Sequence, residues 1–231
     1  MKNNSYGFLV FLIIMLSSCG PTLRIIAGFK DPKVESRESI KQYLSENKFE
    51  IETYFLKVEN KRDSTEIFNR FLFGFNSDVY LFNTKTGDKY CFLGTEECSG
   101  VQMQEAFKNF DENYRPCTDE SEPKLKDFLN ILVNQNGEKV ETNSLPEAEF
   151  YLFQTWNKYV ESKKRFKENL VWLEELGKNS NKIEVIYVNT DLLDDWGLEK
   201  GKSLPIKIRR DGKKSVNMYF GSLPLAKQHH E

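Results

Sequence analysis

The chain has few histidines, few cysteines and no long hydrophobic run, and each shortage excludes a class of function. Its two histidines, His229 and His230, stand at the end of a chain of 231 residues, where a solvated tail is expected. Catalytic triads that need histidine are therefore excluded. The four cysteines show no spacing typical of a metal site, so neither a metal nor another cofactor is expected.

A strong excess of one charge is also missing. The chain has 33 Lys and Arg against 35 Asp and Glu, a formal net charge of -2. Basic runs are followed by acids, as where Lys163, Lys164 and Arg165 precede Glu168 and Glu174. No basic face for nucleic acid is predicted, and nucleic acid is not expected as a partner. The 18 Phe, 10 Tyr and 3 Trp are enough for the core of one large or two small domains.

The hydrophobic run that is present lies at the start, from Gly7 to Leu16, after the basic Lys2. It is too short to cross a bilayer as a helix, which needs about 20 residues. It therefore predicts a removable export signal. The run ends in Leu16-Ser17-Ser18-Cys19, which resembles the lipobox of bacterial lipoproteins. An ordinary secretory signal with an incidental cysteine, and an uncleaved anchor helix, are the alternatives.

The lipobox resemblance implies that residues 1–18 are a lipoprotein signal peptide and that Cys19 becomes the acylated first residue. Two or three acyl chains, such as palmitate, make a durable membrane anchor, whereas one chain holds only reversibly. No acidic cluster follows Cys19, and in this class that favours the outer membrane of a diderm bacterium. The expected location is the cell envelope, with the lipid bilayer as a partner through Cys19.

Three cysteines remain if Cys19 carries lipid: Cys91, Cys98 and Cys117. In an oxidising compartment this odd number leaves at least one thiol free or paired between molecules. Cys91 and Cys98 are close enough in sequence to bridge across the end of a hairpin, and we take this pair as the candidate disulfide. Cys117 competes with Cys91 as the partner of Cys98, because spacing alone does not fix the geometry.

Composition divides the mature chain into successive regions. The segment after Cys19 carries Leu23, Ile25, Ile26 and Phe29, so it is expected to dock on the body rather than hang free. A polar stretch over 111–122 is the best candidate boundary. The predicted divisions are a tether over 19–33, an α/β region over 34–115, a second domain over 123–221 and a tail over 222–231.

Hydrophobic periodicity and turn residues predict alternating helices and strands. Residues 123–133 fit a helix or a strand equally well. In the first half we expect a helix capped by Ser36, a strand over 49–58, a helix over 63–74, strands over 79–83 and 89–93 around a turn at Gly87, and a helix over 101–110. In the second half we expect a strand over 150–155, a helix over 160–176 that stops at Gly177, a strand over 183–188, a short helix or turn over 191–196, and a hairpin of 206–210 with 215–220.

A strand, a long helix, a strand and then a hairpin imply a mixed sheet with helices on its faces, in which the first two strands are parallel. Over about 145–220 this order resembles the thioredoxin family. Residues 151–156 are similar to the strand that precedes the family's cysteine pair, residues 188–191 to the end of the next strand, and Leu204-Pro205 to its cis-proline step. The first half could be a degenerate copy of the same plan.

The departure from that family concerns the chemistry. Where the two cysteines would stand, the chain has Asn157, Lys158, Tyr159 and Val160, so it lacks both the nucleophilic and the resolving thiol. The resemblance thus implies a redox-inactive site. Its degenerate positions are Trp156, Asn157, Lys158, Tyr159, Val160 and Pro205. The alternative is that residues 157–160 form only a surface turn.

These features favour a membrane-anchored module that binds an envelope protein or peptide without catalysis, and no catalytic residue is assigned. The alternative is a thiol oxidoreductase that uses Cys98 or Cys117. Acids surround both thiols in sequence, with Glu96 and Glu97 beside the first and Asp119 near the second. Because acids raise the pKa of a thiol, they disfavour this enzyme.

Overall fold

The structure is a computed structural model that describes residues 30–58, 80–94, 105–159, 163–179, 182–204, 206–211 and 215–220. Several predicted features lie outside these residues: the signal peptide, Cys19, most of the tether, the helix over 63–74, Cys98, Val160, Pro205 and the tail. Among the described residues, no helix is long and apolar enough to cross a membrane.

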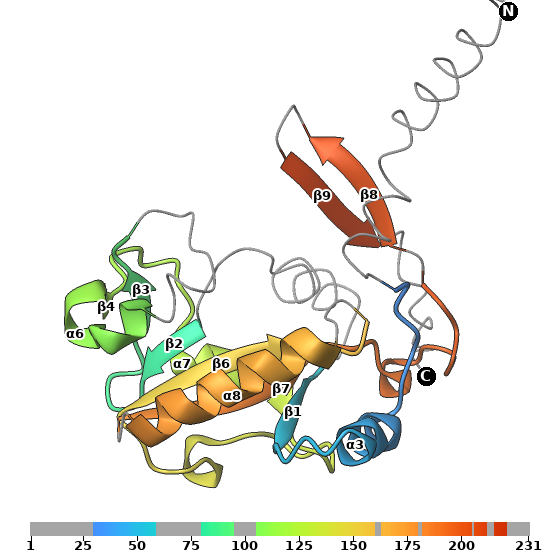
Figure 1. Cartoon of the computed structure of the whole chain (residues 1–231), viewed down its shortest axis with the longest axis horizontal. Helices are drawn as coiled ribbons and strands as arrows, with labels where there is room; N and C mark the ends of the chain where they lie inside the picture. Colours follow the sequence, from blue (N-terminus) through green and yellow to red (C-terminus); the bar gives the residue numbers. More distant parts are fainter. Residues whose placement is uncertain are drawn as a thin grey trace, which may run out of the picture.

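The described part is a mixed α/β fold (Figure 1). Its strands are β1 (Thr53–Leu56), β2 (Tyr80–Asn83), β3 (Lys89–Phe92), β4 (Tyr114–Pro116), β5 (Leu132–Val133), β6 (Phe150–Trp156), β7 (Ile183–Asn189), β8 (Ile206–Asp211) and β9 (Ser215–Phe220). Its helices are α3 (Arg37–Glu46), α6 (Phe110–Asn113), α7 (Leu125–Leu129) and α8 (Lys163–Asn179), with 3-10 turns η2 (Thr142–Ser144) and η3 (Asp194–Trp196).

Seven strands form one sheet in the order β4-β3-β2-β6-β7-β1-β5. The pairs β6–β7 and β7–β1 are parallel, and the other neighbours are antiparallel. Strands β6 and β7 are joined through α8, so the predicted parallel crossover and the mixed sheet with flanking helices are confirmed. Figure 1 shows α8 lying across these two strands.

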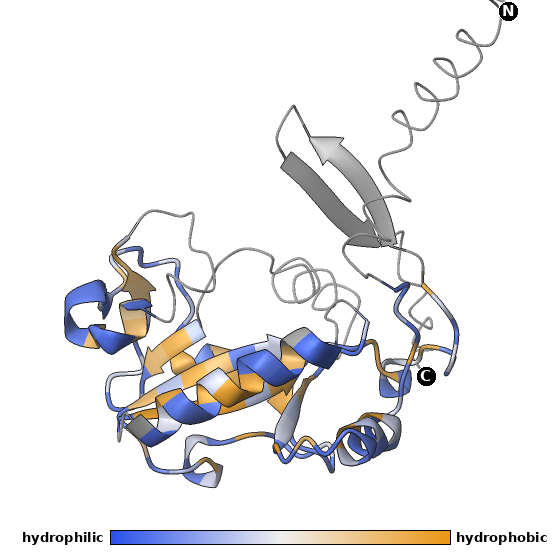
Figure 2. Cartoon of the chain, in the orientation of Figure 1, coloured by the Kyte–Doolittle hydropathy of each residue, from blue (hydrophilic) through white to orange (hydrophobic). Residues whose placement is uncertain are grey.

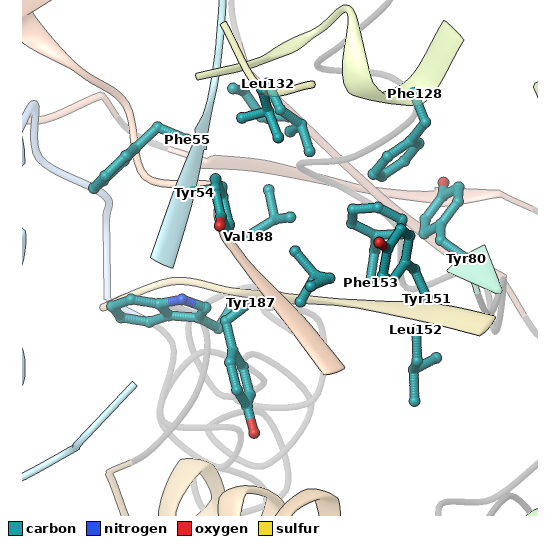
Figure 3. Close-up of a cluster of buried hydrophobic side chains, with 14 of the residues drawn as sticks. Tyr54, Phe55, Tyr80, Phe128, Leu132, Tyr151, Leu152, Phe153, Tyr187 and Val188 are labelled. Carbon is teal, nitrogen blue, oxygen red and sulfur yellow. The ribbon is translucent and has the colours of Figure 1, made fainter. Parts of the chain in front are cut away.

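Strand β6 lies between β2 and β7 in the sheet. Its residues are apolar on both alternating faces, as in a strand that is covered on both sides. On one face Phe153 packs against Phe128 of α7, with ring centroids 4.6 Å apart. On the other face Trp156 stacks on Phe166 of α8 at 4.9 Å. Figure 3 shows the aromatic cluster around Phe128 and Phe153, and Figure 2 shows how the apolar residues gather on the central strands. Helices therefore cover the sheet on both faces.

Local sequence explains most element boundaries. The side chains of Ser36 and Ser39 form a capping box at the start of α3. Gly87 adopts a φ of 73° in the turn between β2 and β3, which favours glycine. The prediction that the long helix stops at Gly177 is wrong, because α8 continues to Asn179. A glycine costs a helix only about 1 kcal/mol relative to alanine and does not by itself end it.

Residues 123–133 take both of the forms that their sequence allowed. Helix α7 contains Leu125, Phe128 and Leu129, which are all buried, and strand β5 follows it at once. Strand β5 then pairs antiparallel with β1 at the edge of the sheet. This short segment thus supplies both a covering helix and an edge strand.

The two predicted α/β regions do not build separate sheets within the described residues. Strands β1 to β3 come from the first region and β5 to β7 from the second, and β1 and β2 flank the central pair on opposite sides. The hairpin β8–β9 was expected to complete the mixed sheet, but it forms a two-stranded sheet of its own. The antiparallel position beside β6 is already taken by β2, so that edge of β6 is closed to the later hairpin.

Candidate functional site

The predicted degenerate site lies where two parallel strands end together. Trp156, the last residue of β6, is paired in register with Asn189, the last residue of β7. Residues 157–159 and 190–191 therefore leave the sheet side by side at its carboxyl end. In open α/β sheets, ligand sites form outside the carboxyl ends of the strands.

Trp156 anchors this end of the sheet from inside. Its side chain is 3% exposed, and its indole N–H donates a hydrogen bond to the hydroxyl of Thr53 on β1 at 3.0 Å. The ring lies between Phe166 and Tyr43, with centroid distances of 4.9 and 6.4 Å. Trp156 is thus a core residue with a satisfied polar atom, and it does not present a binding face of its own.

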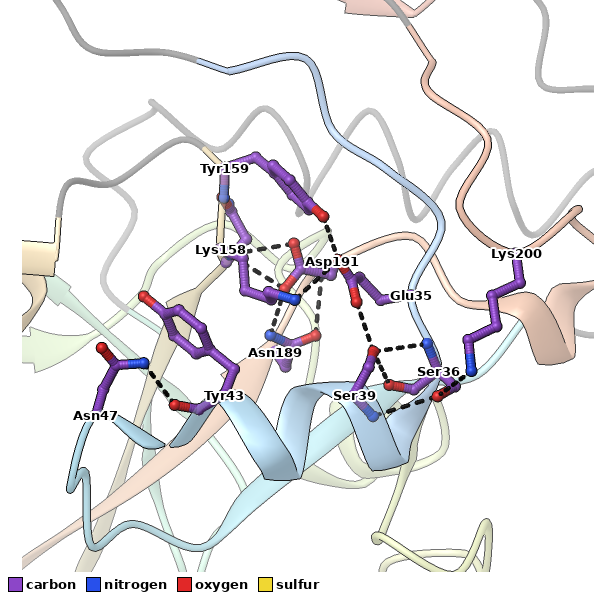
Figure 4. Close-up of polar contacts among 11 residues, drawn as sticks. Glu35, Ser36, Ser39, Tyr43, Asn47, Lys158, Tyr159, Asn189, Asp191 and Lys200 are labelled. Atoms are coloured by element: carbon purple, nitrogen blue, oxygen red, sulfur yellow. Dashed lines mark hydrogen bonds and ion pairs between the residues drawn. The ribbon is translucent and has the colours of Figure 1, made fainter. Parts of the chain in front are cut away.

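The residues after Trp156 belong to a group that we call the carboxyl-end network (Figure 4). Its members come from the first turn of α3 and the residue two before it, from the loop after β6, and from the end of β7. They are Glu35, Ser39, Lys158, Tyr159, Asn189 and Asp191.

Glu35 is the centre of one half of the carboxyl-end network. The Nζ atom of Lys158 lies 2.8 Å from its Oε1 atom, and the two side chains are 11% and 17% exposed for Glu35 and Lys158. The hydroxyls of Tyr159 and Ser39 also donate to the Glu35 carboxylate. Burial by itself raises the pKa of Glu35, but the hydrogen bonds from Lys158, Ser39 and Tyr159 outweigh it and leave the pKa below its usual value.

The same contacts raise the pKa of Tyr159, whereas they lower that of Glu35. Burial raises the pKa of its hydroxyl, and the hydrogen bond to the anionic Glu35 raises it further. Tyr159 is therefore a neutral donor at any physiological pH. Lys158 and Tyr159, at two of the degenerate positions, both direct their polar atoms at Glu35.

Asp191 is the centre of the other half. It is 2% exposed, and its carboxylate accepts the backbone N–H of Lys158 at 3.1 Å and the side-chain N–H of Asn189 at 2.9 Å. The Asn189 side chain in turn accepts the backbone N–H of Asp191. Burial raises the pKa of Asp191 to about 7, although both hydrogen bonds lower it. The carboxylate fixes the loop after β6 to the end of β7.

The remaining degenerate position that the structure describes is Asn157. Its side-chain oxygen accepts the backbone N–H of Tyr159 at 3.2 Å, and its amide donates to Thr190 at 3.4 Å. The loop over 157–159 is thus a turn held at every residue, which accords with the alternative of a turn. Val160 and Pro205 lie outside the described residues.

An extended stretch over residues 30–35, the leading segment, closes the space beside this loop. The Lys30 N–H donates to the Tyr159 carbonyl at 3.0 Å. On its other side the leading segment pairs with residues 201–204. The backbone N–H of Leu204 donates to the Pro32 carbonyl at 2.9 Å, and Lys33 and Ser203 form an antiparallel β-bridge. The prediction that the chain docks on the body before α3 holds for these residues.

Sequence reasoning missed Glu35 and placed Asp191 only at the end of a strand, where a short helix or turn over 191–196 begins. Asp191 could have been found, since it follows the end of a predicted buried strand that is parallel to the strand ending at Trp156. Glu35 gives no such signal, because it lies 124 residues from Tyr159, directly before the helix that Ser36 was expected to cap. Its position depends on how the leading segment returns across the end of the sheet.

Two lysines and an aromatic ring form the outer rim of the network. The Nζ atoms of Lys158 and Lys163 lie 5.4 and 5.5 Å from the centroid of the Tyr43 ring, close enough for cation–π attraction. Lys163 also donates to the Asn47 side chain at 2.8 Å. Lys158 is neutralised by Glu35, but the first turn of α8 holds no acid, so the exposed Lys163 gives this rim a positive charge.

Cys91 and Cys117 lie at a different edge of the sheet, and the predicted cysteine pairing needs correction. Cys91 bonds to Cys117 and not to Cys98, with Cα atoms 5.0 Å apart. Strands β3 and β4 are antiparallel with Cys91 opposite Arg115, so Cys117 is its diagonal neighbour on the same face. Glu122 lies within 4.8 Å of both sulfurs, but sulfurs bonded to each other offer no thiolate ligand to a metal.

Comparison of the chain with protein-family models, with curated proteins and with solved structures finds no match. The function therefore has to be argued from the chain's own residues.

Proposed function

We propose that this protein is an envelope lipoprotein, anchored through acylated Cys19, whose body is a non-catalytic module that binds a protein or peptide. The anchor rests on the Leu16-Ser17-Ser18-Cys19 sequence and on the short apolar run before it. The residues after Cys19 favour the outer membrane of a diderm cell. No nucleic acid and no cofactor take part in the proposed function.

We propose further that the body is a redox-inactive relative of the thioredoxin fold. The support is the parallel pair β6–β7 with its crossover helix α8, together with an antiparallel hairpin beside β6. One difference is that this hairpin, β2–β3, precedes the crossover in sequence, whereas the resemblance placed it afterwards. The sheet arrangement is thus like the expected one, with a different order of its parts.

One observation carries the non-catalytic assignment: at the degenerate positions that the structure describes, the polar side chains are already paired with the chain itself. Lys158 and Tyr159 bind Glu35, and Asn157 binds Thr190 and the loop backbone. Asp191, whose pKa is raised to about 7, is buried beneath them. A general acid or base has to reach its substrate within hydrogen-bond distance, and this arrangement keeps the titrating group away from one.

The thiol alternative loses support at Cys117, because its sulfur is bonded to Cys91 at the β3–β4 edge. What the carboxyl end offers instead is the exposed cation of Lys163 over the ring of Tyr43, beside Lys158, whose charge is neutralised by Glu35. A rigid rim with aromatic and cationic groups is suited to binding a protein surface or peptide that carries acids.

Site-specific crosslinking in intact envelopes tests this proposal. A photoreactive amino acid is placed at exposed Lys163 or Lys200, near the network, and at exposed Lys178 near the far end of α8 as a matched control. We expect one reproducible protein adduct from the first two positions and none from Lys178. Adducts that are absent, or equal at all three positions, would contradict a binding role for the carboxyl end.

The anchor has an independent test. Changing Cys19→Ser should abolish metabolic labelling with palmitate and release the protein from the membrane fraction or stall its processing. Unchanged fractionation of this variant would rule out the lipoprotein assignment, whatever the crosslinking result.

A further inference from the structure

The side-chain carboxylate of Glu35 is held by three donors from other residues. The Nζ atom of Lys158 lies 2.8 Å from its Oε1 atom, and the hydroxyl of Tyr159 donates to the same oxygen. The hydroxyl of Ser39 donates to Oε2. Figure 4 shows the three donor side chains pointing toward Glu35 from the loop after β6 and from α3. We call Lys158, Tyr159 and Ser39 the carboxylate site, because together they bind both oxygens of one carboxylate.

The backbone of Glu35 is held independently of its side chain. Its N–H donates to the Leu192 carbonyl at 2.8 Å, and its carbonyl accepts the N–H of Asp194 at 2.9 Å. The backbone of Val34, one residue before, is bonded on both its N–H and its carbonyl to residues 201–202. The leading segment should therefore keep its place when the Glu35 carboxylate is removed or rotates away.

The donors of the carboxylate site are also positioned without Glu35. The backbone N–H of Lys158 donates to the buried Asp191 carboxylate at 3.1 Å, and that of Tyr159 donates to the Asn157 side chain at 3.2 Å. Ser39 lies in the capping box at the start of α3. A site whose donors are held in place by the fold binds its ligand at a smaller entropic cost. These donors are therefore ready for a carboxylate from another molecule.

A structural role alone does not require an ion pair at this place. Removing two charges from water is costly, and apolar side chains of similar size often stabilise a fold as well as a buried ion pair does. Although burial raises the pKa of Glu35, the three donors hold it below its usual value, so the site favours a charged occupant. The site also lies outside the carboxyl ends of β6 and β7, where ligands bind in open α/β sheets. Both its position and its chemistry therefore fit a ligand site.

We propose that the carboxylate site receives an Asp or Glu side chain of a bound peptide, and that Glu35 fills it in the free protein as an internal competitor. The present occupant identifies the class of ligand. Glu35 and Lys158 are 11% and 17% exposed, so the ion pair borders on water, and the exposed Lys163 nearby attracts acids. The inference rests on the proposed function for its acidic partner, whereas the site itself rests on the contacts of Glu35.

Acetate tests the carboxylate site, because it supplies the atoms that Glu35→Ala removes beyond Cβ. The test uses the mature chain with Cys19→Ser, which carries no lipid. Acetate at about ten times its dissociation constant should shift the folding equilibrium of Glu35→Ala about tenfold toward the folded state, and chloride at equal ionic strength should not. The parent, whose site is filled, should shift by less than about twofold. The matched control Glu46→Ala, which loses an exposed acid at the other end of α3, should respond like the parent.

An equal response of all three chains to acetate, or no response of Glu35→Ala, would overturn the proposal. Adding Lys158→Met to Glu35→Ala removes the cation and should abolish the response, and a response that persists would overturn the proposal as well. If circular dichroism shows that Glu35→Ala does not fold even in acetate, Glu35→Gln replaces it. Its neutral amide should give way to acetate, with a shift of more than about twofold, and no shift would contradict the proposal.

Crosslinking at Lys163 tests whether the partner displaces Glu35. Because Glu35→Gln weakens the internal competitor, it should raise the yield of the protein adduct about twofold or more, whereas Glu46→Gln should leave the yield unchanged. Equal yields from Glu35→Gln and the parent would overturn the displacement. An acetate response with no adduct from any chain would reject the binding function and the displacement but support the carboxylate site. Adducts without an acetate response would reject the carboxylate site and leave the binding function in place.

Discussion

The carboxyl-end network and the disulfide edge both tie together segments that are distant in sequence, but by different physical means. At the carboxyl end, Glu35 and Lys158 are joined by a mostly buried ion pair with hydrogen bonds around it. At the β3–β4 edge, Cys91 and Cys117 are joined by one covalent bond, which closes a loop between residues 26 positions apart. The network depends on the ionisation of its groups, and the disulfide depends on the redox state of its surroundings. The two regions should therefore fail under different conditions.

The largest expected effect comes from breaking the network on one side. Lys158→Met leaves the Glu35 carboxylate buried without its cation, and should lower the free energy of unfolding by about 3 to 4 kcal/mol at neutral pH. Chemical denaturation measures the change. Adding Glu35→Gln to Lys158→Met should recover part of the loss, because the buried charge is then removed. If the single variant is as stable as the parent, the pair contributes nothing to the fold.

Next comes the disulfide. Cys91→Ser together with Cys117→Ser should lower the free energy of unfolding by about 3.5 kcal/mol, as the loop-closure model gives for a sequence separation of 26. Reduction of the parent protein with dithiothreitol should reproduce the loss, whereas the variant should no longer respond to reductant. If the stability lost in the double cysteine variant varies steeply with pH, the disulfide edge and the carboxyl-end network are not independent.

A pH series distinguishes the regions more finely. Because the folded pKa of Asp191 is raised from 3.8 to about 7, the folded protein holds a proton that the unfolded chain releases, and stability is lost as pH rises through this interval. Asp191→Asn should remove about 2 kcal/mol of this decrease between pH 5 and 7, at about 1.4 kcal/mol per unit for one proton. Glu35 acts in the opposite direction, because its pKa is lowered and its stabilisation is lost in acid. A variant that keeps the parent's slope above pH 5 would exclude Asp191 as the titrating group.

The smallest effect is expected from an exposed ion pair on α8. Lys164 lies 3.8 Å from Glu168, and the side chains are 87% and 62% exposed. Lys164→Ala should change the free energy of unfolding by less than about 0.5 kcal/mol. It is the matched control for Lys158→Met, since both remove a lysine from an ion pair. If Lys164→Ala and Lys158→Met lower the free energy of unfolding equally, burial does not make the Lys158 ion pair stronger than the exposed one.

The sequence was sufficient for the centre of the fold. Strand β6, helix α8 and strand β7 have strong local patterns, and Trp156 was correctly placed at the end of a buried strand. The sheet order was not predictable, because β1 and β2 pair with strands that are far away in sequence, and local patterns do not tell which strands pair. The Cys91–Cys117 bond was missed as the candidate pair for a similar reason. It depends on β4, which has three residues of sequence Tyr-Arg-Pro, too few for a strand pattern.

The order of the strands along the chain also has a consequence for folding. The central pair β6–β7 comes from residues 150–189, whereas the strands on its two sides, β1 and β2, are made much earlier. Until residue 189 has been synthesised, Phe55 of β1 has no partner for parallel pairing. Likewise, Leu81 of β2 cannot form its antiparallel pair until Leu152 has been synthesised. Folding therefore depends on contacts between distant segments, which are slow to form. A nascent chain that ends before β6 should remain unfolded and able to cross a membrane through a narrow channel.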